Sequence, residues 1–221
     1  RDQTINIKSA SKSIISAMVG IAIEAEFKGV DQAGLSELAE YAHADADPRL
    51  NQLTVSSLHS MQIKLERTSG ANYGRWVSSS NWVRYVLSRP FVEDPGRPML
   101  YSTGSTRLLS AMLTELETDR LARWLRNGLP NRSTSQFRNG SKIPKGIYLG
   151  GNRMAMSPRS MARLGELYRL GGMIEGERIL PEDWMIEVGN CERHLSGASS
   201  NMVTAGSSPR SAAAPSIMLG D

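Results

Sequence analysis

Three residues of this chain carry side chains that could together break an ester or amide bond: Ser9, Lys12 and Tyr101. A serine hydroxyl is a poor nucleophile until a base takes its proton. A lysine can be that base where burial disfavours its charged form, and a tyrosine beside an ammonium group has a lowered pKa and can relay protons. These three residues are therefore the candidate catalytic group of a serine hydrolase.

The spacing of apolar residues after Ser9 predicts a helix that would bring Ser9 and Lys12 together. Residues three apart lie on the same face of a helix, so both side chains should point the same way at its N-terminus. There Ser9 could cap free backbone N–H groups, or its own N–H could face a developing oxyanion. Taken alone, Ser-x-x-Lys is explained better by a helix cap beside a surface lysine. The apolar stripe consists of Ile15, Met18, Val19, Ala22 and Ile23.

Tyr101 stands at the start of a second predicted helix, on a loop from which its phenol could enter a cleft. One face of that helix would carry Leu108, Leu109, Met112, Leu113 and Leu116. The second motif therefore supplies the proton-relaying group that Ser-x-x-Lys alone lacks.

A third stretch, residues 146–185, is rich in boundary signals. Ser157 followed by Pro158 predicts a helix start, and Gly171 with Gly172 predicts its end. A hairpin should turn at Glu175–Gly176, and Pro181 should open another helix reaching Val188. The apolar face of the first of these helices would be Met161, Leu164, Leu167 and Tyr168.

Together these stretches resemble the serine β-lactamase and penicillin-binding-protein superfamily. The resemblance is closest to its class C β-lactamase-like branch, with the class C-like esterases and 6-aminohexanoate-oligomer hydrolases. Ser9-Ala10-Ser11-Lys12 matches the Ser-x-x-Lys motif, Tyr101-Ser102-Thr103 stands in the Tyr-x-Asn or Tyr-x-Ser position, and residues 148–172 look like the returning helix. The resemblance covers about residues 5–118 and 146–188.

The resemblance implies an α+β fold of the β-lactamase/transpeptidase type: an α/β domain with an antiparallel sheet, packed on an all-helical domain, with this chain mostly helical. Residues 1–30 would be the nucleophile helix of the α/β domain and 31–145 the helical domain with a basic linker. Residues 146–194 would be return helices of the α/β domain, and 195–221 a low-complexity tail rich in Ser, Ala, Gly and Pro.

The resemblance also implies a mechanism. An ester or amide would acylate Ser9, Lys12 and Tyr101 would share the base and acid roles, and water would release the acyl group. Thr103 would contact the lysine and the substrate, and Tyr73 and Trp76 would line an acyl pocket. The expected partner is a small-molecule ester or amide, with no metal and no cofactor.

The chain departs from the family pattern at both ends of the matching region. Only eight residues precede Ser9, fewer than the strands that come before this helix in the family, and no third motif is evident. Residues 194–197 and 203–206 are faint candidates for that motif, which supplies the second oxyanion-hole amide. Without covering strands the stripe of the first helix would be exposed, which invites association. An inactive or incomplete module that acts through chain association, as a homo-oligomer for example, is therefore the alternative.

Composition and charge limit the other classes of function. The chain has 221 residues and one cysteine, Cys191, which excludes an internal disulfide framework. The apolar run 14–23 is too short to span a bilayer, although it imitates a secretory signal, and the compartment stays undetermined. His43, His59 and His194 lack metal-ligand spacing, and Asp45 and Asp47 fit a turn better than a calcium loop.

A basic run between residues 119 and 163 could meet phosphates, with Trp124 and Phe137 as stacking groups, but a solvated face is the more usual role of such a run. Nucleic-acid binding is therefore the weakest of the three hypotheses. The run consists of Arg120, Arg123, Arg126, Arg132, Arg138, Lys142, Lys145, Arg153, Arg159 and Arg163.

Overall fold

The computed structural model describes residues 3, 5–25, 27, 29–33, 36, 38–96, 98–113 and 154–188. In these ranges short helices dominate, and the strands form two small antiparallel pairs. Strand β1 (Ile5–Asn6) pairs with β2 (Ala155–Met156), and β3 (Met173–Ile174) pairs with β4 (Glu177–Arg178). The first pair joins segments that lie far apart in the sequence, next to the candidate nucleophile.

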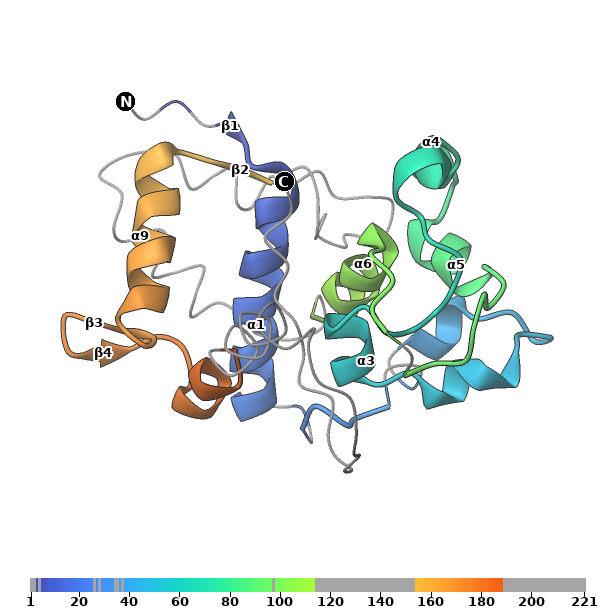
Figure 1. The fold of residues 1–221 in the computed structure, drawn as a ribbon, viewed down its shortest axis with the longest axis horizontal. Coiled ribbons are helices and arrows are strands. Elements are labelled where there is room, and N and C mark those ends of the chain that lie inside the picture. Colours follow the sequence, from blue (N-terminus) through green and yellow to red (C-terminus); the bar gives the residue numbers. More distant parts are fainter. Residues whose placement is uncertain are drawn as a thin grey trace, which may run out of the picture.

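Helix α1 (Ser11–Ala25) lies in the middle of the molecule, between two groups of helices (Figure 1). On one side lies α9 (Pro158–Arg169), and on the other lie α3 (Val55–His59), α5 (Trp82–Leu87) and α6 (Thr103–Met112). The central position of α1 explains why its apolar residues continue around most of its circumference.

Two hydrophobic clusters cover α1 on different faces. Ile14, Ala17 and Ile21 pack in a cluster with Leu164 and Leu167 of α9. Ile15, Val19 and Ala22 belong to a larger cluster with the helices α3, α5 and α6. Burying an aliphatic side chain of this size stabilises a fold by roughly 1.5–3 kcal/mol. The expectation of an exposed stripe was therefore wrong, because Ile15, Val19 and Ala22 are each at most 2 % exposed.

The predicted stripe was also too narrow. Met18 and Ile23 are only partly buried, whereas Ile14, Ala17 and Ile21, which lie outside the stripe, are buried. A single period of 3.6 residues identifies one buried face, and α1 has two. Helix α6 shows the same behaviour, since every residue from Thr103 to Met112 is buried.

Helix α9 and the hairpin follow their boundary signals. The Ser157 hydroxyl accepts a hydrogen bond from the backbone N–H of Ser160 at 3.2 Å, and Pro158 occupies the first turn. After the helix, Gly171 and Gly172 have positive φ angles of +62° and +83°, a conformation that favours glycine. The predicted burial of Met161 on the apolar face was wrong, because this residue is 36 % exposed.

The last described helix, residues 182–188, lies directly on α1. A Cβ atom added to Gly20 of α1 would stand 2.4 Å from the indole ring of Trp184. Glycine at position 20 therefore permits a close approach that every other residue would block.

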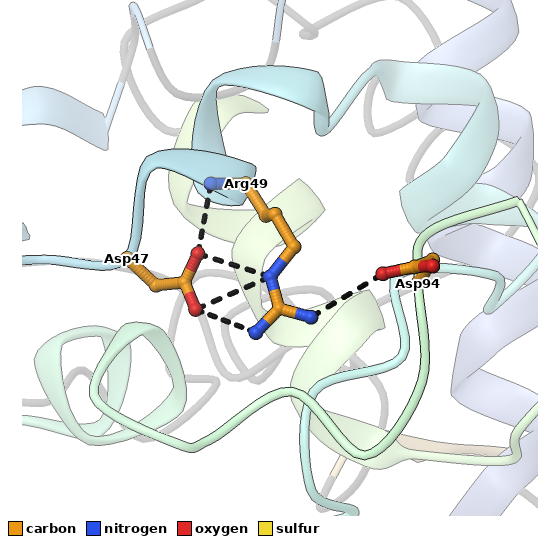
Figure 2. A network of polar contacts seen from close by, with 3 residues as sticks. All are labelled: Asp47, Arg49 and Asp94. Carbon is orange, nitrogen blue, oxygen red and sulfur yellow. Dashed lines mark hydrogen bonds and ion pairs between the residues drawn. The ribbon is translucent and has the colours of Figure 1, made fainter.

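Asp47 serves as the expected turn residue. Its carboxylate accepts from the backbone N–H of Arg49 at 2.9 Å and caps the 3-10 helix η3 (Pro48–Gln52). The Arg49 guanidinium donates to Asp47 at 2.7 Å and to Asp94 at 3.4 Å (Figure 2). The hydrogen bonds from the Arg49 side chain and backbone N–H hold the pKa of the Asp47 carboxyl below its usual value. The network ties η3 to the loop that carries Asp94.

Candidate active site

Ser9 and Tyr101 meet in the structure although they are 92 positions apart. The Ser9 hydroxyl and the Tyr101 phenol oxygen are 3.0 Å apart, within hydrogen-bonding distance, and either can donate. Both side chains are half-buried, so this pair is partly open to solvent. A nucleophile and a group able to take its proton are therefore adjacent.

Lys12 completes the cluster. Its ammonium nitrogen lies 5.2 Å from the centroid of the Tyr101 ring, and the residue is only 7 % exposed. An ammonium group at this distance from an aromatic face is attracted to it, and it also stabilises negative charge on the phenol oxygen. The structure thus brings together the three predicted catalytic side chains.

The surroundings of the Tyr101 phenol favour its charged form. Burial by itself raises the phenol pKa, but hydrogen bonding with Ser9, the hydrogen bond and charge of Lys12, and hydrogen bonding with Thr103 outweigh burial and lower the pKa below its ordinary value. A lower pKa raises the fraction of the phenol that is present as phenolate, the form that can accept a proton from a serine. The electrostatics therefore suit the base role.

Ser9 is held by a short, tightly fixed segment. It lies inside the 3-10 turn η1 (Lys8–Ala10), which directly precedes α1. The expectation that Ser9 caps a helix was wrong, because its hydroxyl bonds to Tyr101 and no side chain caps η1. Upstream, the backbone N–H of Ile7 donates to the carbonyl of Met154 at 3.0 Å, which continues the β1–β2 pairing.

Lys8, the residue before Ser9, has a φ angle of +51°, which is uncommon for a residue with a side chain. Neighbouring side chains bond both of its peptide groups. The Asn6 Oδ1 atom accepts from the Lys8 N–H at 2.8 Å, and the Ser11 hydroxyl donates to the Lys8 carbonyl at 2.7 Å. Such backbone strain persists where the surroundings hold it in place, and it is common at functional sites.

Tyr101 is held through the start of helix α6. The N-cap residue Ser102 makes no capping hydrogen bond with its own side chain. Instead, Thr68 and Ser69 act from a distant loop: the Thr68 hydroxyl accepts from the Gly104 N–H and the Ser69 hydroxyl from the Thr103 N–H, both at 2.9 Å. Two N–H groups that a helix start leaves without intrahelical partners are satisfied in this way.

The predicted substrate-binding residues lie in different surroundings. Thr103 is 5 % exposed, and its hydroxyl is 3.0 Å from that of Ser69. Trp76 is 2 % exposed, donates from its indole N–H to the Trp82 carbonyl, and belongs to the helical core. Tyr73 is half-buried and meets the Trp76 ring edge-to-face at 5.8 Å. Substrate contact by Thr103, Tyr73 and Trp76 stays a prediction, and the burial of Trp76 favours a supporting role beneath Tyr73.

Sequence reasoning missed Thr68 and Ser69. Their types were visible in the sequence, but no periodicity or short motif links them to residues 102–104, and the hydrogen bonds span 34 to 36 positions. The one available signal was that Ser102 precedes a helix that lacks a Glu or Gln three residues later, so its capping box is incomplete.

Several predicted features lie outside the described residues: the run 119–153, Leu116, Cys191, His194, and both third-motif candidates, 194–197 and 203–206. Within the described ranges no group of three or more His, Cys, Asp or Glu residues could hold a metal ion. The same part of the chain contains no helix with the length and apolarity to cross a bilayer.

The fold of this chain is similar to that of several solved structures. The chain matches the hydrolase EstCE1, described as having promiscuous acyltransferase activity, at 18 % identity with a TM-score of 0.62, over 86 % of this chain and 64 % of that one. It matches the D-amino acid amidase of Ochrobactrum anthropi SV3 at 14 % identity and a TM-score of 0.60, over 86 % and 61 %.

A third match is the octameric penicillin-binding protein homologue of Pyrococcus abyssi, at 14 % identity and a TM-score of 0.58, over 85 % of this chain and 48 % of that one. This chain thus spans about half to two-thirds of the length of these proteins. No family model matches the chain, and no curated protein matches it.

These likenesses show the fold: the described part of the chain has the α+β architecture of the serine β-lactamases and penicillin-binding proteins. The predicted fold class is confirmed. Ser9, Lys12 and Tyr101 meet at one place in that architecture.

Proposed function

We propose that this chain carries the catalytic centre of a serine hydrolase that cleaves an ester or an amide through an acyl-enzyme on Ser9. The observation that carries this proposal is the 3.0 Å contact between the Ser9 hydroxyl and the Tyr101 phenol, with the Lys12 ammonium beside the ring. A helix cap does not explain this arrangement, because the Ser9 hydroxyl caps nothing in η1.

In the proposed first half-reaction the Ser9 oxygen attacks the substrate carbonyl carbon, and its proton passes to the Tyr101 oxygen. The Lys12 ammonium stabilises the phenolate before the transfer. The backbone N–H of Ser9 is our candidate for one donor to the oxyanion. The carbonyl–oxygen or carbonyl–nitrogen bond then breaks, and the leaving group takes the proton from Tyr101.

In the second half-reaction a water molecule attacks the acyl carbon. Tyr101 accepts the water proton and returns it to the Ser9 oxygen as the acid product leaves. The same three side chains therefore serve both halves. The second oxyanion donor belongs to the third motif, whose candidates at 194–197 and 203–206 stay predictions; losing one such donor typically slows a reaction about a hundredfold or more.

The names of structural neighbours support the choice of bond. One is an amidase for D-amino acids, one is a hydrolase with acyltransferase activity, and another is described as a family VIII carboxylesterase. Esters and amides share a carbonyl carbon that serine can attack, so the proposal covers both. An octameric neighbour makes self-association of this chain worth measuring.

The test is covalent labelling with a fluorophosphonate probe or a labelled β-lactam, followed by mapping of the modified residue. We expect modification at Ser9 and none in Ser9→Ala. Ser13→Ala is the matched control, since Ser13 is a half-buried serine of α1, the helix that directly follows η1, and it should label like the unaltered chain.

Equal labelling of Ser9→Ala would overturn the proposal. An unaltered chain that does not label, turns over p-nitrophenyl esters only at background and elutes as an oligomer would instead favour the inactive module that acts through association.

A further inference from the structure

The Ser11 hydroxyl is bonded to the peptide group that carries the backbone N–H of Ser9. It donates to the carbonyl oxygen of Lys8 at 2.7 Å, and the direction of this bond is fixed because a carbonyl oxygen can only accept. The backbone N–H of Ser11 bonds to the same oxygen. Since the Lys8 carbonyl and the Ser9 N–H belong to one peptide group, both donors of Ser11 act on the unit that holds the proposed oxyanion donor.

A planar peptide group transmits this constraint from its oxygen to its N–H. The described part of the chain has no cis peptide bond, and in a trans peptide the C=O and N–H bonds point in opposite directions. Because the Lys8 oxygen points toward Ser11 at the start of α1, the Ser9 N–H points away from that helix. Among the residues that the structure describes, no acceptor bonds to this N–H, so it is available to a substrate beside Ser9.

Burial makes the bond from Ser11 specific. The residue is 0 % exposed, so its hydroxyl has no solvent to bond and depends on the Lys8 carbonyl. The other side-chain bond to Lys8, from its N–H to the Asn6 Oδ1 atom, acts on the preceding peptide group. Of these two side chains, only Ser11 therefore acts on the peptide that follows the left-handed φ angle of Lys8 and contains the Ser9 N–H.

We propose, resting on the function proposed above, that Ser11 is a positioning residue whose hydroxyl holds the Lys8–Ser9 peptide so that the Ser9 N–H faces the oxyanion formed when Ser9 attacks. Ser11 does not touch the reacting atoms. It acts through the peptide group, in two ways. The bond fixes the direction of the N–H, and a hydrogen bond accepted by the carbonyl polarises the peptide and strengthens its N–H as a donor.

A pair of covalent probes separates this role from a merely structural one. In a fluorophosphonate the Ser9 oxygen bonds to phosphorus, fluoride leaves, the serine proton passes to Tyr101, and the P=O oxygen gains negative charge during the attack. The thio analogue carries P=S instead, and sulfur accepts hydrogen bonds only weakly. A loss of stability slows labelling by both probes equally, whereas a misdirected oxyanion donor slows the oxygen probe more.

The experiment measures the rates at which the two probes label Ser9 and takes their ratio, oxygen over sulfur. We expect this ratio to fall about fivefold to tenfold in Ser11→Ala, the equivalent of about one hydrogen bond. Ser11→Cys, which is close to serine in size but a weak donor, should fall similarly. Ser11→Thr keeps the hydroxyl and should restore the ratio. Ser13→Ala, the matched control on α1, should leave it unchanged.

NMR provides a readout that does not depend on activity. The sequence contains two Lys–Ser pairs, Lys8–Ser9 and Lys12–Ser13, so labelling lysine carbonyls with ¹³C and serine nitrogens with ¹⁵N yields one peptide signal for each. Ser13→Ala removes the second signal and so assigns both. In Ser11→Ala the carbonyl of the Lys8–Ser9 signal should move to lower ppm, because it loses a donor, while the Lys12–Ser13 signal serves as the internal reference.

The inference and the proposed function fail in different ways. An unaltered chain that never labels at Ser9 contradicts the proposed function, and the Lys8–Ser9 signal then decides whether Ser11 holds this peptide. Labelling at Ser9 with an unchanged oxygen-to-sulfur ratio in Ser11→Ala and Ser11→Cys overturns the role of Ser11 alone. If Ser11→Ala does not fold, Ser11→Cys carries the same comparison. A Lys8–Ser9 signal that stays in place in the folded variant also overturns the inference.

Discussion

His59 should make the stability of this protein depend on pH. The residue is 8 % exposed; its Nε2 atom lies 2.9 Å from the Ser16 hydroxyl, and its ring meets that of Trp184 edge-on at 5.0 Å. Burial disfavours the charged imidazolium and lowers the His59 pKa from 6.5 to about 4. The folded protein therefore holds this ring neutral at pH values where the unfolded chain would protonate it.

The direction and the size of this pH dependence of stability follow from proton linkage. Between pH 6.5 and 4 the unfolded state binds more protons at this position, so the free energy of unfolding falls as the pH falls through that window. Above pH 6.5 the full stability is present. Going from pH 7 to pH 5 should lower the free energy of unfolding by about 2 kcal/mol. The full lowering of the His59 pKa from 6.5 to about 4 corresponds to about 3 kcal/mol.

The assay is urea unfolding at a series of pH values between 7 and 5, comparing the unaltered chain with His59→Gln. Glutamine can still bond Ser16 but does not titrate, so the difference between the two pH dependences isolates His59. His43→Gln is the control at an exposed histidine and should keep the pH dependence of the unaltered chain. If His59→Gln loses stability with falling pH as steeply as the unaltered chain, the assignment of a neutral buried imidazole is refuted.

Two further predictions concern backbone positions. Gly20→Ala should lower the free energy of unfolding by about 1–3 kcal/mol, because its methyl group would overlap the Trp184 ring; Gly165→Ala in α9, where nothing lies within 4 Å, should instead raise it by up to about 1 kcal/mol. Thermal melts of both variants check this pair, and equal melting temperatures would contradict it. At Lys8, glycine should be tolerated at φ +51° whereas valine should cost about 1–2 kcal/mol and slow probe labelling at Ser9; labelling rates of Lys8→Val no lower than those of Lys8→Gly would show that this strained residue does not position Ser9.

Local signals in the sequence were enough to predict several elements of the fold. Ser157 with Pro158 marked the start of α9, Gly171 with Gly172 its end, and Glu175–Gly176 the hairpin turn, because each signal depends only on neighbouring residues. Where burial depended on distant partners the prediction failed. Met161 is on the apolar face by spacing, yet no element of the described chain covers it fully.

The sequence was enough to predict the catalytic side chains of the candidate site, but not the residues that hold them in place. The motifs around Ser9, Lys12 and Tyr101 identified the three side chains, and the structure brings them together. Thr68 and Ser69 escaped notice because a hydroxyl that caps a helix from another segment has no fixed spacing to that helix. The two-sided burial of α1 was missed for a different reason: only one apolar stripe was assigned to the helix, although Ile14, Ala17 and Ile21 outside it are apolar as well.

The place of α1 between two clusters also bears on how the chain folds during synthesis. Tyr168 donates to the carbonyl of Ser13 across 155 positions, and β1 pairs with β2 over a comparable separation. Because the ribosome releases the N-terminal part first, the segment bearing Ser9 emerges long before the residues that cover Ile14 and Ile21. Contacts so distant in sequence slow folding, so this helix would need shielding from aggregation while translation continues, and the nucleophile would gain its final setting only late in assembly.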